Sequence, residues 1–149
     1  MYRVLVPIDS SEERTAAQVE AVASLPGTSG SVEATLLYVF EDRETAESTS
    51  VTQLRTGGTA EQELLDRGVA VETQSRYGDP AEEILEVADE IDADLIVLGG
   101  RKRSPLGSLL FGSVSQAVTL DATRPVVVTG GVKESETEEE GEEEPAPAA

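Results

Sequence analysis

The sequence predicts an α/β fold in which a five-stranded, parallel, doubly wound sheet carries helices on both faces. Five short apolar runs rich in β-branched residues recur along the 149 residues, and the intervals between them can hold helices. Alternation of strand and helix is typical of a parallel sheet. The predicted strands cover residues 2–8, 34–40, 69–75, 95–98 and 125–129. Two stretches are continuously apolar, which favours central strands covered on both faces: Val4-Leu5-Val6 in the first run and Leu95-Ile96-Val97-Leu98, the whole of the fourth.

The first strand and the first helix have clear boundary residues. Pro7 has no backbone N–H to donate to a ladder, so we expect the strand to end there. Ser10 and Glu13 have capping-box spacing, which predicts a helix with Ser10 as its N-cap. Pro26-Gly27 should end that helix.

The segment after the second strand is polar and contains Gly57-Gly58, so we expect a mobile loop over residues 41–58 and a helix only over about residues 59–67. Asp79-Pro80 predicts an N-cap and a first-position proline for the third helix. The last helix is predicted over residues 113–120. Its expected inward face is Val114, Ala117, Val118 and Leu120.

Composition excludes several classes of chemistry. The chain has no Cys and no His, which removes disulfides, thiol nucleophiles, Ser-His-Asp triads and nearly all zinc sites. The formal net charge is -19, from 30 acidic and 11 basic residues, and such a surface repels nucleic acids and anionic membranes. We expect neither as a partner. No apolar window reaches the roughly 18 residues of a membrane span, and the chain starts in strand-like sequence, so we expect a cytoplasmic location.

The acidic excess also predicts a halophilic source, because Lys102 and Lys133 are the only lysines and aromatic residues make up only 3% of the chain. Molar salt shortens the screening length to about 3 Å, which makes self-repulsion tolerable. We expect the melting temperature to rise between dilute and molar potassium chloride, as thermal denaturation would measure.

Two parts of the chain differ in composition: we expect a domain over residues 1–131 and a disordered acidic tail over residues 132–149. From Lys133 onward the chain has eight Glu, one Lys and no apolar periodicity, so it cannot offset its ordering entropy. A solvating tail is favoured over a docking tail for a basic partner.

The stretch from Gly99 to Ser113 carries a resemblance to a known family. Universal stress proteins have Gly, two residues, Gly, nine residues and then Gly-Ser or Gly-Thr. Gly99, Gly112 and Ser113 match this spacing, whereas Lys102 stands at the second Gly. Further matching segments occur in the family's order: Val6-Pro7-Ile8-Asp9, Leu36-Leu37-Tyr38-Val39, Gly78-Asp79-Pro80 and Arg124-Pro125-Val126-Val127-Val128. The sequence therefore resembles a universal stress protein over most of residues 1–130.

A ligand site follows from the fold. In a doubly wound sheet of order 3-2-1-4-5, ligands bind beyond the carboxyl ends of strands 1 and 4, where the order reverses. Asp9 and Gly99 follow those strands, and the helix opening at Ser113 offers free N–H groups and a positive dipole end to a phosphate. Asp9 is placed to accept from ribose hydroxyls. The alternative is that the glycines serve turns and that Asp9 only starts a helix.

The resemblance implies a ligand of the ATP or AMP class, with Mg²⁺ as its companion. It implies that the Val39 backbone meets the adenine and that Ile8, Leu98 and Val114 line the cleft. The predicted nucleotide-binding residues are Pro7, Ile8, Asp9, Val39, Leu98, Gly99, Lys102, Gly112, Ser113 and Val114.

Lys102 leaves two outcomes open. A side chain at the second Gly position blocks the site if the backbone needs positive φ or close approach there. Otherwise Arg101, Lys102 and Arg103 attract phosphate and replace lost amide contacts. A third interpretation is a solvated charge run.

Two functions remain: a regulatory nucleotide-binding module, or a family member that acts only through contacts with a protein partner that the sequence does not identify. We expect no enzyme, because no Walker A or G-x-G-x-x-G sequence occurs. The resemblance implies a homodimer formed through the last strand, from Pro125 to Thr129, whose apolar edge needs covering.

Overall fold

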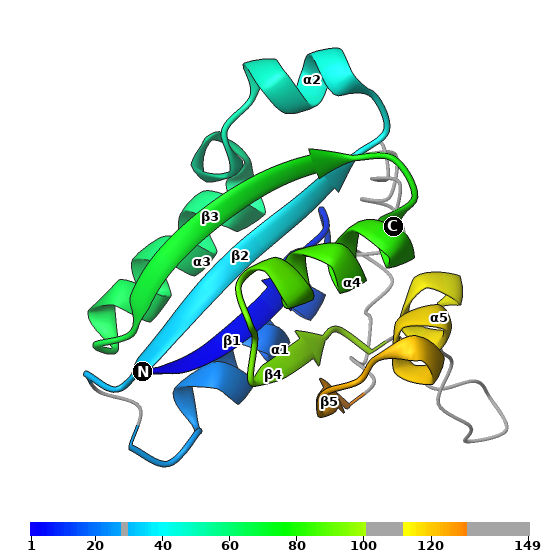
Figure 1. Ribbon diagram of the computed structural model, residues 1–149. Helices are drawn as coiled ribbons and strands as arrows, with labels where there is room; N and C mark the ends of the chain where they lie inside the picture. The colour runs from blue at the N-terminus through cyan, green and yellow to red at the C-terminus, as the bar shows by residue number, and fades with distance from the viewer. Residues whose placement is uncertain (28–29, 101–111, 131–149) are drawn as a thin grey trace, which may run out of the picture.

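A computed structural model describes residues 1–27, 30–100 and 112–130. Its centre is one sheet of five strands in the order β3-β2-β1-β4-β5, with every ladder parallel (Figure 1). The strands are β1 (Tyr2–Pro7), β2 (Val32–Phe40), β3 (Ala70–Tyr77), β4 (Leu95–Leu98) and β5 (Val126–Val128). The predicted α/β fold and strand order are confirmed.

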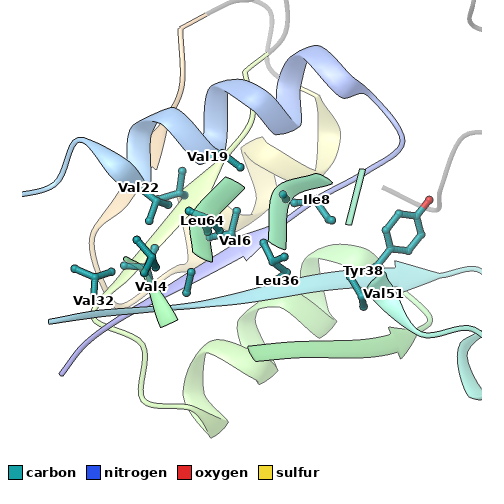
Figure 2. Packing of buried hydrophobic residues seen from close by; sticks show 14 of the residues in the cluster. Val4, Val6, Ile8, Val19, Val22, Val32, Leu36, Tyr38, Val51 and Leu64 are labelled. Atoms are coloured by element: carbon teal, nitrogen blue, oxygen red, sulfur yellow. The ribbon is translucent and has the colours of Figure 1, made fainter. Parts of the chain in front are cut away.

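Helices cover both faces of this sheet. In Figure 1, α4 (Pro80–Glu90) and α5 (Ser113–Asp121) lie in front of the sheet, and α1 (Glu12–Ala23) and α3 (Arg55–Asp66) lie behind it. The pleat divides the core accordingly, because successive side chains point to opposite faces. Val4 and Val6 of β1 pack on the α1 and α3 side, whereas Leu5 packs on the α4 and α5 side. Figure 2 shows Val19 and Val22 of α1 gathered with Val4 and Val6.

The two central strands are buried throughout their apolar runs, as predicted. Val4, Leu5 and Val6 are fully buried, and all four residues of β4 are buried. Pro7 is the last residue of β1, which confirms its predicted position. Asp79 caps α4 by accepting from the N–H of Glu82 at 3.0 Å, and Pro80 is the first helical residue, also as predicted.

The predicted start of the first helix was wrong by one residue. The cap is Ser11, whose Oγ accepts from the N–H of Arg14 at 3.2 Å, and α1 begins at Glu12. The physical reason lies one residue earlier. Oδ1 of Asp9 accepts from the N–H of Ser11 at 2.9 Å, which carries the chain past Ser10 before the helix can begin.

The predicted loop over residues 41–58 was also wrong. This segment forms α2 (Arg43–Ser48), the 3-10 turn η1 (Val51–Gln53) and the start of α3. Gly57 lies inside α3, where a Cβ would come 2.0 Å from the carbonyl oxygen of Val51. The glycine therefore permits close packing of α3 on η1 and does not break the helix.

The ends of other elements differ slightly from prediction. β3 extends to Tyr77, and β5 is limited to its three valines. In α5, Val118 is buried and Val114 is partly buried, but Leu120 is 75% exposed, so its predicted inward orientation was wrong. None of the helices in the described ranges is long and apolar enough to cross a membrane. The predicted tail lies outside the described residues.

Candidate functional site

A cleft opens at the carboxyl ends of β1 and β4, the two strands between which the order of the sheet reverses. Its empty space, counted together with open solvent at its mouth, is about 540 Å³. Its walls come from the end of β1, the first two turns of α1, the end of β4 and the start of α5, together with one residue of α4. The lining residues are Pro7, Ile8, Asp9, Arg14, Gln18, Ile84, Leu98, Gly99, Gly112, Ser113, Val114 and Ser115.

The structure brings eight of the ten predicted site residues together in this lining. The two exceptions are Val39 and Lys102. Val39 is buried in β2 among the core residues that face α4, and its backbone lies in register with Arg76 of β3. Lys102 lies outside the described residues.

The start of α5 differs chemically from the starts of α1 and α4. Ser11 and Asp79 cap those two helices with side-chain oxygens, but Gly112 precedes α5 and makes no side-chain cap. The first N–H groups of a helix have no partner within the helix and carry its positive dipole end. Gly112 and exposed Ser113 present this end of α5 to the cleft, where it can contact an anion.

Asp9 is held from several sides. Its Oδ1 accepts from the N–H of Ser11 at 2.9 Å, and its Oδ2 accepts from Nε of Arg14 at 3.0 Å. Its backbone oxygen accepts from the hydroxyl of Thr56 at 2.8 Å. These contacts link β1, α1 and α3 beside the cleft. A ligand hydroxyl that bonds to this carboxylate must share it with Arg14.

Sequence reasoning missed Gln18, which ties the two central strands together beneath the cleft. Its side chain is 1% exposed, and its Nε2 donates to the carbonyl oxygens of Pro7 at 2.6 Å and Val97 at 3.0 Å. Gln18 follows Arg14 by four residues, so the two side chains share a face of α1. A glutamine within the apolar stripe of a helix was the signal that could have identified it.

The adjacent glycines Gly99 and Gly100 allow two different close approaches. A Cβ on Gly99 would come 3.2 Å from the Cβ of Arg14 and 3.2 Å from Oε1 of Gln18. A Cβ on Gly100 would come 2.1 Å from the backbone oxygen of Thr129, while the N–H of Gly100 donates to the Thr129 hydroxyl at 3.0 Å. The absence of a side chain at Gly99 therefore lets α1 pack closely beside the cleft. The absence of one at Gly100 lets its backbone pack against and bond to Thr129, which follows β5.

The described residues offer no cluster of three or more His, Cys, Asp or Glu side chains that could hold a metal ion. Asp9 is the carboxylate among the lining residues. Magnesium is commonly bound by one or two carboxylates together with phosphates of the substrate. The donors of this cleft therefore fit a Mg²⁺ ion brought by a phosphorylated ligand better than a resident one.

Comparison with known proteins agrees with this architecture. The profile of the universal stress protein family matches residues 1–130. Over 68 residues the chain is 44% identical to a universal stress protein of Mycolicibacterium smegmatis, covering 45% of this chain and 52% of that protein. Over 69 residues it is 41% identical to the universal stress protein YxiE of Bacillus subtilis, covering 46% of this chain and 47% of that protein. The matched segment thus spans about half the length of these curated relatives.

Solved structures match over nearly the whole fold. A universal stress protein from Archaeoglobus fulgidus has a TM-score of 0.64 at 26% identity, covering 87% of this chain and 98% of that one. A dAMP complex of an Archaeoglobus fulgidus universal stress protein has a TM-score of 0.59 at 21% identity, covering 87% and 98%. An AMP-bound family protein from Arabidopsis thaliana has a TM-score of 0.65 at 20% identity, covering 89% and 93%. At 21% and 20% identity, the similarity to the dAMP and AMP complexes shows a shared fold and nothing further.

Proposed function

The chain belongs to the universal stress protein family, and on this basis we propose that it is a regulatory module that binds a nucleotide of the ATP or AMP class in the cleft between β1 and β4. One observation carries the proposal: Asp9, Gly99 and the start of α5, distant in sequence, meet in one cleft at the point where strand order reverses. The AMP and dAMP complexes of proteins with the same fold support the choice of ligand.

Each wall of the cleft has a part in this proposal. The N–H groups at Gly112 and Ser113 receive the phosphates, which the positive end of α5 attracts. Asp9 accepts from ribose hydroxyls. Ile8, Leu98 and Val114 supply apolar contacts, with Val39 proposed to meet the adenine through its backbone. Mg²⁺ would enter with the phosphates of the nucleotide and screen their charge.

A variant at the start of α5 tests this arrangement. Ser113→Asp is expected to weaken ATP binding by about tenfold or more, since it places a carboxylate beside the phosphates. The same substitution should leave the helix intact, because an acidic residue in the first turn complements the dipole. Isothermal titration with ATP and thermal denaturation measure the two effects.

Gln116→Glu is the matched control, because it adds one negative charge to an exposed position of the same helix outside the lining. It should bind ATP nearly as the wild type does. Equal ATP affinity in wild type and Ser113→Asp would contradict a phosphate site at the start of α5.

A second candidate is a family member that acts through protein contacts without a nucleotide, which Lys102 favours by standing at a family glycine. Titration of wild type and Lys102→Gly with ATP separates the possibilities. Tighter binding by the variant supports blockage by the lysine, and weaker binding supports a phosphate contact from it.

We also propose that two copies pair through residues 125–129. The observation behind this is that β5 is an edge strand and that Val127 within it is 38% exposed. Exposed apolar edges need covering, and pairing between copies would cover this one. Binding without catalysis and a cytoplasmic location complete the proposal. A monomer by light scattering at molar potassium chloride would contradict the pairing.

A further inference from the structure

Arg14 is a charged residue of the cleft that the proposed contacts do not use. It lies in the first turn of α1, lines the cleft together with Gly99, Gly112 and Ser113, and has a side chain that is 17% exposed. A group so placed is partly withdrawn from solvent, where its interaction with an anion is screened less than on the open surface.

We propose that Arg14 is the phosphate-contacting side chain of this cleft and makes it selective for phosphorylated over unphosphorylated adenine ligands. This inference rests on the proposed function, because it names the residue through which the same cleft recognises its ligand's charge. Such a residue supplements the N–H groups of α5 with a full positive charge.

The charge of the molecule favours a cation in a cleft that binds a nucleotide. The chain carries a formal net charge of -19, so its general field repels a nucleotide. Among the described lining residues, Asp9 and Arg14 are the charged ones. Asp9 alone would add to the repulsion of a phosphate. The Arg14 guanidinium, 3.0 Å from the Asp9 carboxylate, offsets that charge at the place where the phosphate would bind.

The surroundings of Arg14 hold it in place for this task. Its Nε donates to Asp9 Oδ2, and Asp9 is itself anchored to Ser11 and Thr56. Its Cβ lies against Gly99, where an added Cβ would come 3.2 Å from it. A guanidinium is planar and carries five N–H donors, so it can bond a carboxylate and a phosphate at the same time. An arginine oriented before binding loses less side-chain entropy when the ligand arrives.

The other arginines that form ion pairs in the described part of the chain are placed differently. Arg67, for example, pairs with Glu20 in the last turn of α1, at the opposite end of the helix from the cleft, and its side chain is 46% exposed. An exposed pair of this kind contributes little to stability, and Arg67 does not line the cleft. Arg67→Gln therefore makes the same change in net charge as Arg14→Gln at a site far from the ligand.

The test compares three ligands, which are ATP, adenosine and inorganic tripolyphosphate, at one fixed ionic strength. Wild type, Arg14→Gln, Arg14→Lys and Arg67→Gln are titrated by calorimetry, and their melting temperatures are recorded. Arg14→Gln is expected to weaken ATP binding by about 10- to 100-fold, the loss of one charge-assisted contact, and to leave adenosine binding within about twofold. The ATP affinity of Arg14→Lys should lie between those of wild type and Arg14→Gln, because lysine keeps the positive charge but lacks the planar, forked donors of a guanidinium. Arg67→Gln should match wild type.

Failure of this inference and failure of the proposed function give different results. If wild type binds ATP and Arg14→Gln binds it equally or more tightly, the role of Arg14 is overturned and the function stands. A parallel loss of ATP and adenosine binding overturns the role too, since it indicates a structural effect. If wild type binds neither ATP nor adenosine, the proposed function is overturned, and the titration with tripolyphosphate tests the role of Arg14. Tripolyphosphate binding that is lost in Arg14→Gln supports an anion site at Arg14. Tripolyphosphate binding that is absent from wild type or unchanged in Arg14→Gln overturns that role.

Discussion

Gly57→Ala is expected to destabilise the domain by about 3 kcal/mol, although alanine is the better helix former by about 0.5–1 kcal/mol. Gly57 lies within α3, and an added Cβ would come 2.0 Å from the Val51 carbonyl oxygen and 2.9 Å from the Val51 carbonyl carbon. Val51 is buried, so η1 cannot move away without disturbing the core around it. Packing predicts that Gly57→Ala lowers the stability, whereas helix propensity predicts that it raises it. Because the added Cβ would come so close to backbone atoms, we expect the packing effect to be the larger.

Urea denaturation at a fixed high salt concentration measures the change. Gly58→Ala is the matched control, because its Cβ would meet the Thr52 carbonyl oxygen at 2.9 Å, which requires a smaller shift. We expect its loss of stability to be clearly smaller. A Gly57→Ala variant as stable as wild type, or more stable, would contradict the packing of α3 on η1.

Gly100→Ala is expected to destabilise the domain by about 3 kcal/mol or more, because a clash with the backbone and the loss of a hydrogen bond add together. Its Cβ would come 2.1 Å from the Thr129 backbone oxygen, and the displacement would also break the buried bond from the Gly100 N–H to the Thr129 hydroxyl. A buried donor left unsatisfied adds about 1–3 kcal/mol of desolvation cost, unless water reaches it. Because Gly100 directly follows the cleft wall at Gly99, the cleft should loosen together with the fold.

Gly99→Ala is the neighbouring control. Its nearest contacts, 3.2 Å away, are the Cβ of Arg14 and the side-chain oxygen of Gln18, and both need to give by only a few tenths of an ångström. We expect a stability loss of about 1 kcal/mol or less, the lower end for overpacking. Unfolding free energies of the two variants from urea denaturation make the comparison. We predict that alanine is tolerated better at Gly99 than at Gly100. Equal losses of unfolding free energy in the two variants would contradict the close contacts described for these glycines.

Much of this fold could be predicted from the sequence, because the signals that define it are local. The continuous apolar runs marked the central strands, since a strand covered on both faces needs no polar residue. Asp79-Pro80 marked the start of α4 because capping acts over three residues. The family spacing at Gly99, Gly112 and Ser113 pointed to the carboxyl edge of the sheet, where the cleft lies.

The missed features depend on contacts between distant parts of the chain. Gly57-Gly58 predicts a break because helix propensity disfavours glycine, whereas the close approach of η1 requires glycine at position 57. Gln18 is explained by its bond to the carbonyl of Val97, 79 residues away. The place of Arg14 in the cleft likewise follows only once α1 is laid beside Gly99. Neither side chain could be assigned from the sequence alone.

Titration of the purified, folded chain with ATP at molar potassium chloride tests the central claim most directly. The structure presents an anion-attracting helix start, a carboxylate and a guanidinium in one cleft, and we predict saturable binding of one nucleotide per chain, weakened by Ser113→Asp. Wild-type chain that melts cooperatively yet gives no saturable binding of ATP would contradict nucleotide binding.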